Sequence, residues 1–237
     1  MGNPTRFTSG VGTAYQGETL GNYPLPDPFH TGSTQGLGIS IYENDFNTLI
    51  GTDYTVTGSS STFTLSSTIV GGAGVLTPGG ATTATAAYKA GSFLQFQEGN
   101  QFWYEARFKA SAVSSTKSFY VGLRNGSGVT DGLWFAKAAS STSVNLVSTV
   151  GSTATTLVTG VATAAADTWL NLGFYYDGTD LLVYSDNALV ARVSAPTIGT
   201  SGTTLSSVLM APVFQITPTA TDTLSVDFVL AAQELVR

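Results

Sequence analysis

A two-residue alternation of apolar and polar side chains, which begins near Leu37, most constrains how this sequence can fold. In residues 102–109 (FWYEARFK), every second side chain is apolar and the charged side chains lie between them. The same period recurs in residues 119–124, 170–176 and 224–230. Because successive side chains of a strand point to opposite faces, each run is predicted to bury one face of a β-strand. No segment has a convincing helical period.

Short turn signals separate these runs: Asn125-Gly126, Asp131-Gly132, Asp177-Gly178 and Asp186-Asn187. Asn, Asp and Gly tolerate positive φ, so the last two signals predict tight hairpins. Residues 55–92 and 138–168 are rich in small residues, which is typical of a linker, but their recurring Val, Leu and β-branched Thr favour strands. About a dozen short antiparallel strands predict an all-β, two-sheet jelly-roll sandwich.

Composition agrees with a packed domain. Hydrophobic residues make up 42% of the 237-residue chain and charged residues only 10%. This balance excludes disorder for most of the chain, because disordered chains combine low hydrophobicity with high charge. The apolar stripes predict which side chains point into the core: Phe108, Leu123, Leu172, Phe174, Val226 and Phe228.

The first 36 residues have a different character. Pro4, Pro24, Pro26 and Pro28 stand among glycines and polar residues, and proline neither continues a helix nor fits a central strand. We therefore expect an extended N-terminal arm over residues 1–36, followed by a β-sandwich domain over residues 37–237. Isolated apolar side chains would anchor the arm on a neighbouring molecule: Phe7, Tyr15, Tyr23, Leu25 and Phe29.

Charge and cysteine content exclude several classes of protein. The net charge of −6 opposes a nucleic-acid partner, which requires a basic face. No uninterrupted apolar stretch is long enough to span a membrane. Without cysteine, no disulfide or thiolate metal site can form. The N-terminus lacks the pattern of a signal peptide, so we expect synthesis in a cytoplasm.

The sequence offers little for catalysis. Its single histidine, His30, lies in the arm, so a Ser–His–acid triad or a histidine zinc site is not expected. Glu43 and Asp45 are two residues apart on one predicted strand, which favours a solvated surface over a catalytic pair. A cluster of three aspartates near the predicted hairpins could bind calcium, but a role in forming the turns explains them more simply. These residues are Asp177, Asp180 and Asp186. We therefore expect no catalytic residue, no metal, no cofactor and no enzyme activity.

Aromatic side chains form the remaining candidate site. Five of them lie on strand faces opposite the apolar stripes, or on ambiguous faces: Trp103, Tyr120, Trp134, Tyr175 and Tyr184. They could stack on sugar rings in a groove, or they could be interface anchors, where Trp and Tyr are enriched. The sequence does not separate these two interpretations.

Two segments resemble the concanavalin A-like jelly roll of laminarinase-like glycosidases and laminin-G-like modules. One is residues 102–109, and the other is residues 168–190, with TWLNLGFYYD followed by LLVYSDN and LV. Residues 223–229 (TLSVDFV) are similar to the closing strand, so the resemblance covers roughly residues 40–235. The laminarinase catalytic strand has the pattern E-x-D-x-x-E, whereas residues 130–137 (TDGLWFAK) contain one acid, Asp131. The resemblance therefore implies the fold and no catalytic residue.

The N-terminal segments NPTRFTSGV (residues 3–11) and LPDP (residues 25–28) resemble the start of capsid decoration proteins of short-tailed phages. This resemblance implies a structural virion protein, a cement protein on the outer capsid surface. Its partners would be the major capsid protein and other copies of itself, as a homotrimer. The alternative is a carbohydrate-binding module, or a virion protein that adheres to host glycans, without catalysis. A glycoside hydrolase is the third alternative, and it lacks paired acids.

Overall fold

A computed structural model gives the fold of the chain. It describes residues 39–49, 52–80, 84–113, 116–126, 130–217 and 222–235, together with the backbone of residues 12–13 and 26–27. Every regular element in these residues is a β-strand. Among them there is no helix that is long and apolar enough to cross a membrane. The prediction of an all-β fold is therefore confirmed.

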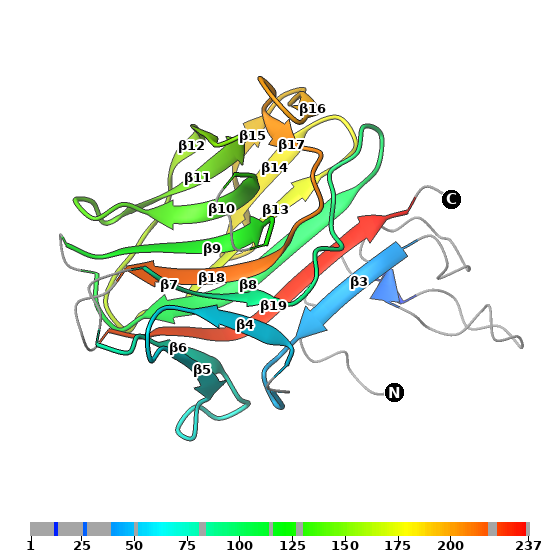
Figure 1. The fold of residues 1–237 in the computed structure, drawn as a ribbon. Helices are drawn as coiled ribbons and strands as arrows, with labels where there is room; N and C mark the ends of the chain where they lie inside the picture. Colours follow the sequence, from blue (N-terminus) through cyan, green and yellow to red (C-terminus); the bar gives the residue numbers. More distant parts are fainter. Residues whose placement is uncertain are drawn as a thin grey trace, which may run out of the picture.

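Two antiparallel sheets form the body of the molecule and pack face to face (Figure 1). The seven-stranded sheet has the order β12-β11-β10-β9-β18-β7-β4. Its strands are β4 (Tyr54–Thr57), β7 (Thr85–Lys89), β9 (Ser118–Arg124), β10 (Gly132–Lys137), β11 (Ser143–Val150), β12 (Thr153–Thr163) and β18 (Ala211–Thr217). Strands that are distant in the sequence are neighbours here, because β18 lies between β9 and β7.

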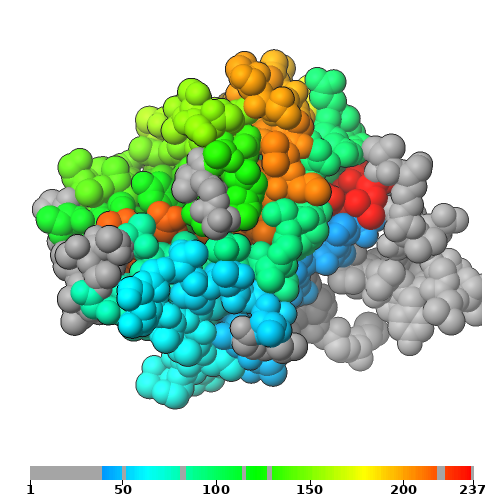
Figure 2. Space-filling view, viewed as in Figure 1, coloured from blue at the N-terminus to red at the C-terminus, as the bar shows by residue number. Residues whose placement is uncertain are grey.

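The eight-stranded sheet has the order β15-β14-β13-β8-β19-β6-β5, and β3 also pairs with β19. Its strands are β3 (Ile39–Asn44), β5 (Thr62–Leu65), β6 (Gly74–Thr77), β8 (Phe102–Ala110), β13 (Leu170–Tyr176), β14 (Leu181–Ser185), β15 (Ala188–Val193) and β19 (Leu224–Glu234). Two small sheets pair β1 (Gly12–Thr13) with β2 (Pro26–Asp27) and β16 (Ile198–Gly199) with β17 (Leu205–Ser206). Figure 2 shows residues from distant parts of the sequence, coloured blue to cyan, green and orange to red, together on one face of the molecule.

The predicted hairpins and small-residue strands are present. Gly178 (φ 95°) lies in the turn between β13 and β14, and Asp186 and Asn187 (φ 48° and 65°) form the turn between β14 and β15. The small-residue segments contain β4 to β7 in the first case and β11 and β12 in the second. Neither segment is a linker.

The core lies between the two sheets. Five of the six side chains predicted to point inward are fully buried: Phe108, Leu123, Leu172, Phe174 and Val226. The prediction for Phe228 is wrong, because this side chain is only partly buried. A bulge in the pairing of β19 with β8 inserts Asp227 between Val226 and Phe228. The extra residue reverses the alternation, so that Val229 points into the core instead.

The expected arm lies almost entirely outside the described residues. This holds for all five of its predicted anchors: Phe7, Tyr15, Tyr23, Leu25 and Phe29. The division into an arm of residues 1–36 and a domain of residues 37–237 therefore stays a prediction.

Candidate functional site

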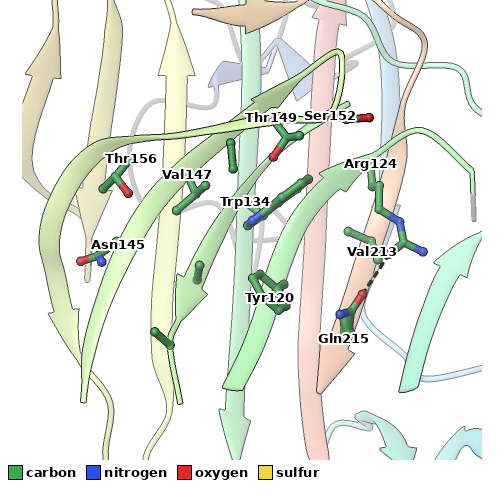
Figure 3. Close-up of a pocket in the computed structure, with 13 residues that line it drawn as sticks. Tyr120, Arg124, Trp134, Asn145, Val147, Thr149, Ser152, Thr156, Val213 and Gln215 are labelled. Atoms are coloured by element: carbon green, nitrogen blue, oxygen red, sulfur yellow. Dashed lines mark hydrogen bonds between the residues drawn. The ribbon is translucent and has the colours of Figure 1, made fainter. Parts of the chain in front are cut away.

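A groove of about 480 Å³ lies on the outer face of the seven-stranded sheet. Its lining comes from five neighbouring strands, β12, β11, β10, β9 and β18, and from the turn between β11 and β12. Since neighbouring strands are about 4.8 Å apart, this lining spans roughly 20 Å across the sheet. The lining residues are Tyr120, Arg124, Trp134, Ala136, Ala138, Asn145, Val147, Thr149, Ser152, Ala154, Thr156, Val213 and Gln215 (Figure 3).

Trp134 forms the floor of this groove. Alternation along β10 points Leu133 and Phe135 into the core and leaves Trp134 on the outer face. Two glycines allow the close packing of Trp134. A Cβ atom at Gly132 would lie 2.1 Å from Cζ3 of the indole, and one at Gly122 would lie 2.5 Å from Trp134 Cα. Tyr120 packs edge-on against the indole, with ring centroids 6.1 Å apart. Trp134 is therefore closely packed and only 4% exposed.

Two polar atoms in the floor have no hydrogen-bond partner among the described residues. They are the indole Nε1 of Trp134 and the hydroxyl Oγ1 of Thr149, and both are buried. Figure 3 shows Thr149 beside Trp134, with Asn145 on one side of the indole and Arg124 and Gln215 on the other. Buried polar groups of folded proteins nearly always have a partner, so each exception requires an explanation.

Arg124 supplies the positive charge of the groove. Its side chain is 4% exposed; Nε donates to the carbonyl of Gly126 (3.1 Å) and Nη1 donates to Oε1 of Gln215 (2.9 Å). The guanidinium also lies over the ring of Tyr88, 5.6 Å from its centroid. Burial lowers the pKa of Arg124, and the nearby Tyr88 opposes that shift. Arginine still remains protonated at neutral pH.

None of the described residues that line the groove is acidic. Asp131, the one acid in the segment compared with the laminarinase catalytic strand, has a structural role at the start of β10. Its Oδ1 accepts hydrogen bonds from Ser206 Oγ (2.7 Å) and from the backbone of Gly151 (3.2 Å). The groove-facing positions of that segment are Trp134 and Ala136. The lining can therefore bind a polar ligand by hydrogen bonds and aromatic contact.

The five predicted aromatic residues fall into two clusters on opposite outer faces. Tyr120 and Trp134 line the groove, whereas Trp103, Tyr175 and Tyr184 lie on the eight-stranded sheet. The ring of Trp103 lies 5.6 Å from that of Tyr175 and 5.8 Å from that of Tyr184. Burial, followed by nearby acidic groups, raises the pKa of Tyr175 to about 12. The sequence could not show which aromatic residues share a face, because this depends on the order of the strands in the two sheets.

Glu105 belongs to the same outer face of the eight-stranded sheet. Its Oε1 accepts a hydrogen bond of 2.9 Å from Nδ2 of Asn171 on the neighbouring strand. Burial raises the pKa of Glu105, and the bond from Asn171 offsets part of that shift. This carboxyl group lies on the sheet opposite the groove, so it does not contact a ligand bound there.

The acidic residues considered for calcium act in the turns. Asp177 Oδ1 accepts from the backbone nitrogens of Thr179 (2.8 Å) and Asp180 (2.7 Å). Asp180 in turn accepts from Arg192 and from the backbone of Ala195. In the described part of the chain, no group of three or more His, Cys, Asp or Glu side chains is placed to hold a metal ion.

Sequence reasoning did not identify the six polar residues of the groove: Arg124, Asn145, Thr149, Ser152, Thr156 and Gln215. A local signal was available for Arg124, because it lies four residues after Tyr120 on the same strand and therefore on the same face. Asn145 and Thr149 likewise alternate with the buried Val144 and Leu146. Only the strand order reveals that these rows share one groove.

Solved structures with the same fold include hydrolases. An endo-1,3-β-glucanase from Streptomyces sioyaensis has a TM-score of 0.59 and 10% identity, over 84% of this chain and 98% of that one. A β-glucanase from Bacillus licheniformis has a TM-score of 0.56 and 10% identity, over 83% and 98%. A glycosidic hydrolase has a TM-score of 0.57 and 12% identity, over 81% and 95%. No protein-family model matches the sequence, and no curated protein matches it.

These similarities define the chain as a concanavalin A-like jelly roll, in agreement with the prediction. They also correct the expectation that it is not an enzyme, because glycosidases and glucanases share its fold. That expectation rested on the absence of the E-x-D-x-x-E pattern from one strand segment, residues 130–137. A catalytic pair can also come from carboxyl groups that the fold brings together from distant strands. Nothing in the comparisons points to a capsid decoration protein.

Proposed function

We propose that this protein binds a carbohydrate in the groove of the seven-stranded sheet. The observation that carries the proposal is the pair of buried atoms in the floor without a protein partner, Trp134 Nε1 and Thr149 Oγ1. A sugar hydroxyl both donates and accepts hydrogen bonds. Because both atoms are closed off from solvent in the unliganded groove, we expect neighbouring lining side chains to move on binding, so that one ligand hydroxyl accepts from the indole N–H while another pairs with Thr149. Binding would thus satisfy groups that the folded chain leaves open.

The rest of the lining supports the same ligand class. Tyr120 offers a partly exposed ring, Asn145 and Gln215 offer amides, and Ser152 and Thr156 offer hydroxyls at the exposed rim. Ligand sites commonly combine apolar surface with a few placed polar groups in this way. A length of roughly 20 Å across five strands suits an extended oligosaccharide better than a single small molecule. The glucanases of the same fold, by their names, act on polysaccharides, which adds support.

A panel of neutral and charged oligosaccharides, screened by calorimetry, tests the proposal. Two conservative variants remove one hydrogen-bonding group each: Trp134→Phe deletes the indole N–H, and Thr149→Val replaces the hydroxyl with a methyl group. We expect each to weaken binding about three- to tenfold, the value of one net hydrogen bond. Reducing-sugar release, measured on the same panel, establishes whether the bound carbohydrate is also hydrolysed.

Trp103→Phe is the matched control, because it makes the same deletion on the opposite sheet. It should leave the affinity unchanged. Failure of every oligosaccharide to bind would overturn the proposal. Binding that is lost in Trp103→Phe and kept in Trp134→Phe would also overturn it, since the ligand would then occupy the other face.

The capsid cement role and its partners, the major capsid protein and a homotrimer, remain a separate hypothesis. It depends on the arm of residues 1–36, which lies almost wholly outside the described residues. A carbohydrate-binding groove on the body is compatible with a location on a virion surface. Sedimentation of the protein with capsid shells, with and without residues 1–30, tests this hypothesis independently of carbohydrate binding.

A further inference from the structure

Arg124 differs from most of the basic residues that the structure describes. The described residues form five ion pairs: Lys89–Asp53, Arg107–Asp227, Lys109–Asp167, Lys117–Asp222 and Arg192–Asp180. Arg124 forms none with any described carboxylate, although its side chain is only 4% exposed. A buried charge is costly unless it is paired or hydrogen-bonded, so this position needs an account of its own.

The surroundings of Arg124 compensate the charge only in part. Neutral oxygens of Gly126 and Gln215 accept from Nε and Nη1, and the face of Tyr88 provides a weak cation–π contact. Nη2 donates to no described residue. The guanidinium thus keeps donors that no described residue accepts, and it lines the groove beside the floor residue Trp134 (Figure 3).

The fixed orientation of the guanidinium matters as much as its charge. Gln215 on β18 and the backbone of Gly126 hold two of its nitrogens, so the plane of the group is set before a ligand arrives. Arginine recognises carboxylate and sulfate-like groups through parallel N–H donors in this planar geometry. Since no described lining residue is acidic, nothing in the lining repels an anion.

We infer that the groove selects a carbohydrate that carries an anionic group, a carboxylate or a sulfate, and that Arg124 binds this group. The inference rests on the proposed carbohydrate-binding function and adds the ligand class to it. The anionic group would lie at the β9–β18 end of the groove, beside Arg124 and Gln215. The neighbouring sugar would reach over Trp134 toward Thr149 and Asn145.

The test uses two pairs of oligosaccharides in which only the charge differs. One pair is an oligouronate and its methyl ester, and the other is a sulfated oligosaccharide and its desulfated form. We expect one charged member to bind at least about tenfold more tightly than its neutral counterpart, because charge-assisted hydrogen bonds are the stronger ones. The pair that shows the difference identifies the anionic group as carboxylate or sulfate.

Three variants assign the preference to a residue. Arg124→Gln should reduce the affinity for the charged member to that for the neutral one, and Arg124→Lys, which keeps the charge but not the planar donors, should give an intermediate value. Lys109→Gln is the control, because it removes one positive charge on the other sheet, where Lys109 faces the exposed Asp167 at 3.5 Å. It should leave the preference unchanged.

The outcomes separate this inference from the proposed function. Equal affinity for charged and neutral members overturns the anionic preference and leaves carbohydrate binding intact. A preference that Arg124→Gln preserves overturns the role of Arg124. No binding to any member overturns both statements. The wild-type comparison decides the ligand class even if Arg124→Gln does not fold.

Discussion

At the scale of single residues, the groove floor shows how a binding site departs from what stability alone would favour. Thr149 is 3% exposed and its hydroxyl has no partner in the part of the chain that the structure describes, although an apolar side chain of the same shape would fit there without that cost. The same holds for the indole nitrogen of Trp134. Such residues are expected where function, and not packing, sets the side chain.

Thr149→Val should therefore stabilise the protein while it weakens carbohydrate binding. Removal of a buried hydroxyl without a partner relieves its desolvation cost, which is about 1–3 kcal/mol for such a group. We expect the free energy of unfolding to rise or stay equal, as measured by urea denaturation. A clear loss of stability would show that the hydroxyl already has a partner in the folded protein and would remove the basis for its role in binding.

Glu105 gives a pH-dependent prediction at the same scale. Because burial raises its pKa above the ordinary value of 4.5, the folded state holds the proton more tightly than the unfolded state. The stability linked to this group is therefore present at low pH and is lost as the pH rises through the folded pKa. Glu105→Gln keeps an acceptor for Asn171 and removes the charge, so its stability relative to wild type should increase between pH 4 and pH 7. An unchanged difference in urea unfolding between these pH values would contradict the account.

At the scale of elements, two glycines in neighbouring strands determine where the floor can lie. A Cβ atom at Gly122 on β9 would lie 2.3 Å from the carbonyl oxygen of Leu133 and 2.5 Å from Trp134 Cα on β10. The obstacle is mainly backbone, which a side-chain rotation cannot relieve. Gly122→Ala should therefore push β9 and β10 apart and cost about 1–3 kcal/mol, as expected for overpacking.

Chemical denaturation gives that cost, and near-ultraviolet circular dichroism reports the displacement of the Trp134 indole. Ala138→Ser, at the exposed rim of the groove, serves as the control and should change neither quantity. Wild-type stability and an unchanged spectrum for Gly122→Ala would show that the two strands are not packed as closely as described.

The element scale also shows how far the sequence could predict the structure. Alternation was sufficient to find β8, β9 and β13 and the inward residues Leu224 and Val226 of β19, because a strand has a fixed period of two. It failed at Phe228, because a bulge at Asp227 exchanges the inward and outward positions in the rest of β19. The sequence itself still alternates there and gives no sign of the bulge. The groove could be predicted only in part: Tyr120 and Trp134 were recognisable as outward aromatics, but their meeting with Gln215 depends on pairing between strands about 90 residues apart.

At the scale of the whole molecule, the described residues form a core between the two sheets, in one cluster of buried side chains that extends from Phe46 to Ala231. The composition of the chain changes near residue 36, from prolines and isolated aromatic residues to alternating strands. We therefore expect deletion of residues 1–30 to leave a folded β-domain whose melting temperature is nearly unchanged. A truncated protein that unfolds would show that the arm belongs to the core of the domain, and the predicted boundary near residue 36 would be wrong.

The central claim is that a carbohydrate binds over the floor of the groove, and the three tryptophans of the chain allow a direct test. In the double variant Trp103→Phe, Trp169→Phe, Trp134 is the only remaining tryptophan, so its fluorescence reports on the groove floor alone. Titration with the best oligosaccharide from the screen should give a saturable change in intensity or wavelength, at the affinity found by calorimetry. Calorimetric binding without any change in Trp134 fluorescence would contradict the claim, because the ligand would then bind elsewhere on the molecule.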